Sequence, residues 1–295
     1  MAARSRAPAG RTPRGMKLRK ALAVLFAAGA LLGLWAAGWQ LSRPVNHPVP
    51  MPAGLGFEPM LAGGTHGSLL RAPGSTRCAL LMHGIRGDRS AMAGRAAFLR
   101  DAGWSALAID LQAHGETPGE MITFGHREAD DARNGVAYLR AQGCATVAVI
   151  GQSLGGAASL LGKGPVAADG FVLESVYPAI EDAVANRLAM RFGGLGRLAA
   201  PLLYWQLPLR TGVGREQLRP VQQIRKVQVP VLVAGGTRDG QTPPEETRQL
   251  FDAAGGAKTL WLVEGAIHQD LYAFSPEEYR RRLLRFLDTL GAAPG

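Results

Sequence analysis

Ala145-Thr146-Val147-Ala148-Val149-Ile150-Gly151-Gln152-Ser153-Leu154-Gly155-Gly156-Ala157-Ala158 is the most informative segment of this chain. Its apolar first half predicts a buried strand, and its small-residue second half predicts a closely packed helix. Gly151 and Gly155 suit a sharp turn around Ser153, because glycine has no side chain to crowd it. The free N–H groups of a helix beginning there would face negative charge beside Ser153. The pattern predicts a serine nucleophile; the alternative is a serine that only caps a helix.

Two further polar residues follow predicted strands later in the chain. Asp239 follows the apolar run 229–236, and His268 follows the short strand 258–263. The carboxyl ends of parallel strands meet at one edge of a sheet, which is where open α/β sheets place their chemistry. His268 is the only histidine after Ser153. We therefore predict His268 as the base that serves the serine and Asp239 as the acid that orients it.

Other carboxylates compete with Asp239 for the role of the acid. Glu174 ends the predicted strand 171–173 and is the alternative acid. Asp252 and Asp270 are expected to be solvated charges of a helix or loop.

Backbone N–H groups are expected to stabilise an oxyanion near Ser153. One is that of Leu154, the residue after the nucleophile, and the other must come from the loop after an earlier strand. The strand 78–82 precedes the loop His83-Gly84-Ile85-Arg86-Gly87, so Ile85 is the predicted second donor, with Gly84 allowing close approach. His83 is expected to be a structural residue of the turn.

Four segments of the chain together resemble the α/β-hydrolase superfamily. They are His83-Gly84-Ile85, Asp110-Leu111-Gln112-Ala113-His114-Gly115, Gly151-Gln152-Ser153-Leu154-Gly155-Gly156, and Asp239 with His268. The resemblance covers about residues 57 to 291. It is strongest to the lysophospholipase-like and serine-aminopeptidase-like branch, which includes membrane-anchored members.

The resemblance implies an α/β-hydrolase fold with a mostly parallel central sheet flanked by helices. It also implies the chain order Ser, Asp, His for the triad and a structural role for the turn Asp110–Gly115. Gln112-Ala113 depart from the family pattern, which bears on loop shape. The segment of about 175–226 is then a small helical lid, whose apolar side chains either line an acyl site, contact lipid or pack on the domain.

The same resemblance places Cys78 and Cys144 on neighbouring strands. A disulfide between them is compatible with an oxidising compartment. We favour two buried thiols that pack as small hydrophobic side chains. No Cys/His spacing typical of a metal site is present, and no metal or cofactor is expected.

The N-terminal region predicts a transmembrane segment. Residues 1–20 form a basic tail, and residues 21–41 form an apolar segment long enough to cross a bilayer, with Trp35 and Trp39 near its far end. A Pro-rich linker, 42–56, leads to the hydrolase domain, 57–295. Positive charge before the span predicts a cytoplasmic N-terminus and an extracytoplasmic domain. The alternative is a secreted protein whose signal peptide is cleaved near Ala36-Ala37-Gly38.

Charge distribution argues against a nucleic-acid partner. The net charge is +10, but seven basic residues lie in the tail, which leaves 26 basic against 23 acidic residues in the rest of the chain. A nucleic-acid footprint would lie on the folded domain. The expected partners are a membrane and a small acyl substrate, lipid-derived esters included; the oligomeric state is left open.

These features together predict a serine hydrolase that cleaves carboxylic esters or thioesters through an acyl-enzyme. A serine nucleophile argues against dehalogenase and epoxide-hydrolase chemistry, which in this fold use Asp. A peptide or amide hydrolase of the serine-aminopeptidase type is an alternative, with Glu174 or Glu181 holding the substrate amine. A non-catalytic membrane-anchored binding protein on the same fold is another.

Overall fold

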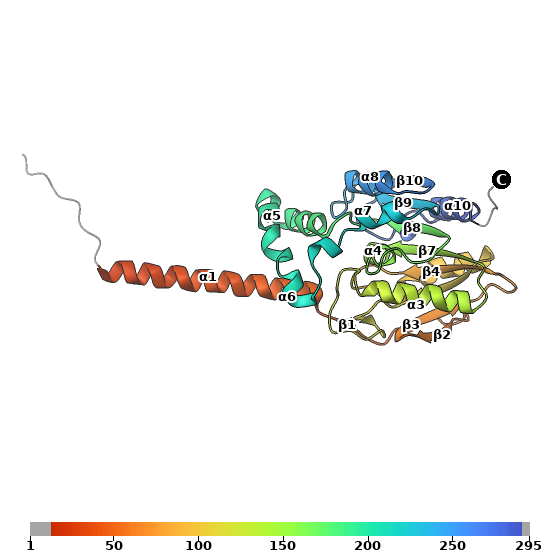
Figure 1. Ribbon diagram of the computed structural model, residues 1–295, viewed down its shortest axis with the longest axis horizontal. Coiled ribbons are helices and arrows are strands. Elements are labelled where there is room, and N and C mark those ends of the chain that lie inside the picture. The colour runs from red at the N-terminus through yellow and green to blue at the C-terminus, as the bar shows by residue number, and fades with distance from the viewer. Residues whose placement is uncertain (1–12, 291–295) are drawn as a thin grey trace, which may run out of the picture.

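The computed structural model describes residues 13–290 (Figure 1). The first twelve residues, which include part of the predicted basic tail, and the last five lie outside the described range. The described chain consists of a long N-terminal helix, a central sheet with helices on both faces, and a helical lid.

The central sheet has eight strands. In spatial order they are β10 (Lys258–Val263), β9 (Val231–Gly236), β8 (Gly170–Glu174), β7 (Thr146–Gln152), β4 (Arg77–Met82), β5 (Ser105–Ile109), β3 (Thr65–Leu70) and β2 (Glu58–Ala62). Pairing is parallel from β10 to β5 and antiparallel at β3 and β2. The sheet is therefore mostly parallel, and the predicted α/β-hydrolase fold is confirmed.

Helices cover both faces of this sheet. They are α2 (Ala93–Asp101), preceded by the 3-10 turn η1 (Arg89–Met92), α3 (Glu128–Ala141), α4 (Leu154–Leu160), α8 (Pro244–Ala253), α9 (Leu271–Phe274) and α10 (Pro276–Leu287). Side chains alternate across the sheet: Leu80 and Met82 of β4 pack with α3 and α4, whereas Ala79 and Leu81 pack with α2 and α10. This alternation buries β4 on both sides, as its continuous apolar run predicts.

The lid lies between β8 and β9 in the chain. It contains α5 (Ile180–Tyr204), α6 (Leu207–Thr211), η2 (Arg215–Gln217), α7 (Pro220–Gln223) and η3 (Ile224–Lys226). Gly193 adopts φ 58° and ψ −146°, so α5 is two helical arms joined by a turn. The arms approach closely at Gly196, where a Cβ would lie 2.2 Å from the carbonyl oxygen of Leu188. The lid is therefore built around a helical hairpin.

The N-terminal helix, α1 (Pro13–Ser42), extends away from the domain (Figure 1). Its segment Arg19–Ser42 is long and apolar enough to cross a membrane, and its most apolar window is not buried. Such a helix is compatible with a membrane anchor or with a signal sequence.

The Pro-rich linker is docked on the domain. Its residues Val45–Asn46 form the strand β1, which pairs in parallel with β6 (His114–Gly115). The side-chain amide of Asn46 donates to the carbonyl oxygen of Thr117 at 2.7 Å. The linker is thus fixed to the loop after β5.

Cys78 and Cys144 form a disulfide, with 5.9 Å between their Cα atoms. The preferred expectation of two free thiols is therefore wrong. Cys78 is the second residue of β4 and Cys144 lies just before β7, the neighbouring parallel strand, so strand pairing brings them together. Sequence spacing alone cannot show this, because the two residues are 66 positions apart.

Candidate active site

Ser153 lies on the turn between β7 and α4, with φ 48° and ψ −106°. A non-glycine residue rarely adopts a positive φ, so the surrounding packing must hold this turn. A Cβ on Gly151 would lie 2.4 Å from the backbone nitrogen of Gly156, and one on Gly155 would lie 2.6 Å from the carbonyl oxygen of Met82. Only glycine fits at both positions, which gives the physical reason for the Gly-x-Ser-x-Gly pattern.

Asp239 and His268 are brought together at the ends of β9 and β10. His268 Nδ1 lies 2.8 Å from Asp239 Oδ2. The other carboxylate oxygen of Asp239 accepts from the backbone N–H groups of Gln241 and Thr242, both at 2.8 Å. Burial by itself would raise the pKa of Asp239, but the hydrogen bond and charge of His268, with these N–H groups, lower that pKa below its usual value. Asp239 is thus suited to remain an anion that orients a histidine.

The backbone at the end of β9 and the loop that carries His268 approach each other closely, which keeps Asp239 and His268 within hydrogen-bond distance. A Cβ on Gly236 would lie 2.2 Å from the carbonyl oxygen of Ala266, so the loop carrying His268 crosses directly over the end of β9. The backbone N–H of Arg238 donates to the same oxygen at 2.9 Å. Gly236 was not singled out from the sequence; a glycine pair at the end of a strand just before an aspartate is the signal that could have found it.

Ser153 lies at the same edge of the sheet, directly after β7. Glu174 ends β8, and Asp239 and His268 follow β9 and β10. The four candidate residues therefore lie at the ends of four adjacent strands. Within residues 13–290, the His268 ring makes its hydrogen bond to Asp239 and none to Ser153. Catalytic hydrogen bonds are often long before substrate binds.

The predicted oxyanion donors lie at this edge, Leu154 at the start of α4 and Ile85 in the loop after β4. Leu154 begins α4, so its N–H has no partner within the helix. Ile85 lies in the loop after β4, where a hydrogen bond from Gly87 N–H to the Gly84 carbonyl oxygen, at 3.1 Å, tightens the turn. Gly84 has room beside it, because a Cβ there would have no neighbour closer than 3.8 Å.

His83 is fully buried at the start of this loop. Its Nδ1 donates to the Gly84 carbonyl oxygen at 2.8 Å, and its Nε2 accepts from Leu111 N–H at 3.1 Å. Burial lowers the pKa of His83 to about 4, so the ring is neutral. The bond from Leu111 joins the loop after β4 to the loop after β5, and the bond to Gly84 holds the ring within its own loop.

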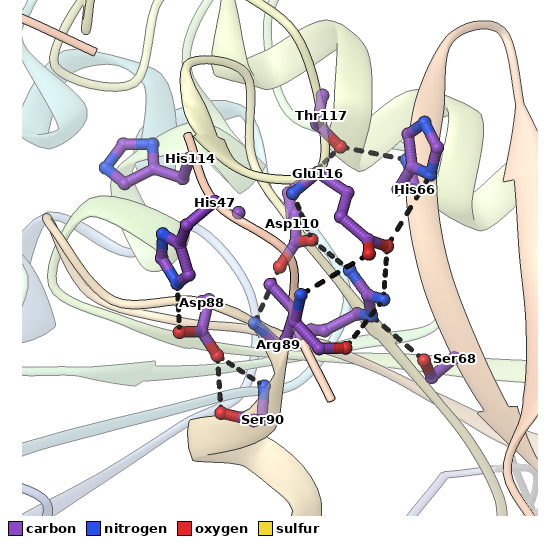
Figure 2. Close-up of polar contacts among 12 residues, drawn as sticks. His47, His66, Ser68, Asp88, Arg89, Ser90, Asp110, His114, Glu116 and Thr117 are labelled. Carbon is purple, nitrogen blue, oxygen red and sulfur yellow. Dashed lines mark hydrogen bonds and ion pairs between the residues drawn. The ribbon is translucent and has the colours of Figure 1, made fainter. Parts of the chain in front are cut away.

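A buried ion pair supports the same region. Figure 2 shows Arg89 between Asp110 and Glu116, with the Arg89 guanidinium paired to both carboxylates. Asp110 also accepts from the backbone N–H groups of Arg89, at 2.7 Å, and Glu116, at 2.9 Å. Arg89 Nη2 donates in addition to the Val49 carbonyl oxygen, at 3.2 Å. The network thus connects the docked linker to η1 and to the loop after β5.

Glu174 does not serve His268 in this structure. Its carboxylate accepts from Arg95 Nη2, at 2.7 Å, and from the Tyr279 hydroxyl. Arg95 is itself buried and also donates to Asp270, at 2.9 Å. The alternative acid is therefore committed to a buried ion pair, and Asp270 is an ion-pair partner that also caps α9 instead of a free solvated charge.

Arg95, Tyr279 and Asp270 were not identified from the sequence as neighbours of the site. They come from α2, α10 and the segment before α9, and no local pattern connects these elements. Glu181, offered with Glu174 as a holder of a substrate amine, is paired with Arg219. Within residues 13–290, no three His, Cys, Asp or Glu side chains are grouped to hold a metal ion.

Comparison with known proteins identifies the family to which this chain belongs. Residues 79–282 match the alpha/beta hydrolase family, and the chain belongs to this family. The uncharacterised protein YqkD of Bacillus subtilis is 26% identical over 195 residues, which is 64% of this chain and 64% of YqkD. The match thus spans less than two thirds of that relative. Caffeoylshikimate esterase of Arabidopsis thaliana is 38% identical over 81 residues, 26% of this chain and 24% of that protein.

Solved structures agree on the fold. The Pyrococcus furiosus esterase Pf2001 superposes with a TM-score of 0.66 at 22% identity, covering 84% of this chain and 98% of that one. By family the chain is an α/β hydrolase, and its fold agrees with that assignment.

Proposed function

We propose that this protein is a serine hydrolase that cleaves carboxylic esters or thioesters. Ser153 is the nucleophile, His268 the general base and Asp239 the acid that orients His268. The observation that carries the proposal is the positive-φ turn at Ser153, set at the same sheet edge as a 2.8 Å His268–Asp239 contact. Esterases among the relatives and structural neighbours support the ester class.

The proposed reaction has two steps. His268 takes the proton of the Ser153 hydroxyl as Oγ attacks the acyl carbon, and the N–H groups of Leu154 and Ile85 stabilise the oxyanion. The bond to the alcohol or thiol breaks, and His268 returns the proton to that leaving group. Water then attacks the acyl-enzyme with His268 as base, which releases the carboxylic acid and restores the Ser153 hydroxyl. Asp239 keeps the required His268 tautomer and stabilises the imidazolium.

The peptide or amide alternative has weaker support. It needs an anion free to hold a substrate amine, and both carboxylates offered for it are engaged, Glu174 with Arg95 and Glu181 with Arg219. The non-catalytic alternative leaves the Ser153 turn and the His268–Asp239 pair without a reason.

For location, we propose that α1 stays attached as a membrane anchor and that the domain lies on the extracytoplasmic side. The Cys78–Cys144 disulfide supports this side of the membrane, because such bonds persist mainly in oxidising compartments. The basic residues before the span support the same orientation.

The test uses the full chain in mild detergent, with a fluorophosphonate label and nitrophenyl esters of graded chain length. Ser153→Ala is expected to abolish labelling and to reduce ester turnover by at least about 10³-fold. Ser175→Ala is the matched control, since Ser175 also directly follows a strand, has a positive φ of 49°, and is buried. Labelling that survives in Ser153→Ala and disappears in Ser175→Ala would refute the assignment.

A further inference from the structure

The domain end of α1 is fastened to the loops that form the candidate site. Arg86, next to the predicted oxyanion donor Ile85, donates through Nη1 to the Gln40 carbonyl oxygen at 3.0 Å. The backbone N–H of Ile122 donates to the Ser42 carbonyl oxygen at 2.7 Å, and Ser42 is buried. These hydrogen bonds hold the domain end of α1 against the domain, so the plane of a bilayer crossed by α1 has a defined position relative to the site.

The lid is fastened to the same end of α1. Gln206 Nε2 donates to the Leu34 carbonyl oxygen at 3.3 Å. The Arg210 guanidinium stacks on the Trp35 ring, 3.9 Å from its centroid, and also donates to the Trp35 carbonyl oxygen. Figure 1 shows α5 and α6 beside the domain end of α1, and α5 contacts α1. Trp35 lies near the end of the span where interfacial aromatic residues gather, so the lid is at the level of the membrane surface.

The turn of the α5 hairpin carries large apolar side chains that are mostly exposed. We call this cluster the lid tip: Met190, Phe192, Leu195 and Leu198, exposed by 61%, 63%, 78% and 78%. Contiguous exposed apolar side chains mark interaction surfaces on proteins. The lid tip also adjoins the candidate site, because Met190 lies against Gly240, the residue after Asp239.

The charge around the lid tip fits a bilayer surface. Residues 183–214 contain four arginines, Arg187, Arg191, Arg197 and Arg210, and no acidic residue. Arg191 and Arg197 lie between the apolar residues of the lid tip in the sequence, and both are exposed. Long cationic side chains beside an apolar cluster can hold their charge among lipid headgroups while the apolar side chains enter the acyl boundary.

We propose that the lid tip docks into the surface of the bilayer that α1 crosses, and that the site takes an acyl ester of an amphiphile resident in that leaflet. The substrate class rests on the proposed hydrolase function, whereas the docking rests only on the retained anchor and the lid. The attachment of the lid to the membrane-spanning helix, through Gln206 and Arg210, selects the lipid surface as the occupant in preference to a second protein chain.

The docking is tested on the full chain, one copy per nanodisc of phosphatidylcholine and phosphatidylglycerol. The two native cysteines are bridged, so a single introduced cysteine carries a polarity-sensitive fluorophore. The label goes on Leu198→Cys, and Leu61→Cys is the matched control, because Leu61 is 65% exposed on β2, at the far edge of the sheet. Brominated lipids are expected to quench the label at position 198 and to leave the one at 61 unchanged. Equal quenching at both positions would overturn the docking.

The substrate class is tested separately, on vesicles that contain monooleoylglycerol. Leu195→Glu with Leu198→Glu is expected to lower turnover of the vesicle substrate by about tenfold per leucine, while hydrolysis of soluble nitrophenyl butyrate is unchanged. Leu61→Glu should change neither rate. An equal fall in both rates would overturn the inference.

The two proposals fail in different ways. A wild-type chain that hydrolyses neither ester, yet shows selective quenching at position 198, refutes the proposed function and leaves the docked lid intact. Hydrolysis of the soluble ester without selective quenching refutes the docked lid alone.

Discussion

Removing the Cys78–Cys144 disulfide should destabilise the domain strongly. The bond closes a loop with a sequence separation of 66 residues. The loop-closure entropy that it removes from the unfolded chain corresponds to about 4.3 kcal/mol at 25 °C. Both cysteines are buried beside β4 and β7, the adjacent central strands of the sheet. The surrounding packing therefore leaves no room for a rearrangement of the native state that would offset the loss of the bond. The perturbation is Cys78→Ala with Cys144→Ala.

The assay is urea unfolding of the full chain in mild detergent, followed by tryptophan fluorescence. With a slope of about 3 kcal/mol per M, the midpoint should fall by about 1.4 M in the double variant. Reduced wild type is the internal control, because it loses the bond but keeps both sulfur atoms, and reductant should have no effect on the variant. Coincident midpoints for oxidised wild type and the double variant would refute the reasoning, as would two thiols that react in unfolded protein before any reduction.

Three further outcomes are expected. Asp239→Asn should lower kcat by about 10³–10⁴-fold at unchanged fold, measured as ester turnover alongside circular dichroism, because His268 would lose its orienting anion. Arg95→Met should cost about 3–5 kcal/mol in urea unfolding, since Glu174 would be left buried without its partner, and adding Glu174→Leu should recover most of it. Burial, with the charges of neighbouring aspartates, raises the pKa of Glu246 to about 7. Its stabilising contribution is therefore complete below the unfolded pKa of about 4.5 and is lost as pH rises through about 7, so Glu246→Gln should flatten the fall in unfolding free energy between about pH 5 and 8.

The elements that the sequence predicted well are those whose signal is local. The apolar run before Ser153 and the glycines around it are consecutive in the chain. The glycines are required at positions 151 and 155 because a Cβ at either position would collide with backbone atoms. Parallel strand ends meet at one edge whatever the details of the loops, so Asp239 and His268 could be expected near each other. The sheet and its flanking helices could be predicted as well, because the alternation of apolar strands with helices is also a local pattern.

The fold class, the turn at Ser153 and the apolar span could therefore be predicted from the sequence, because each depends on neighbours a few residues apart. Which distant groups meet depends on the tertiary structure. The tertiary structure pairs Cys78 with Cys144 and places Glu174 in an ion pair with Arg95. It also docks the linker on β6 and the lid on the end of α1. A cysteine, a glutamate or a proline-rich segment has the same local pattern whether it is free or engaged, so its partner is set by how the strands and helices are packed.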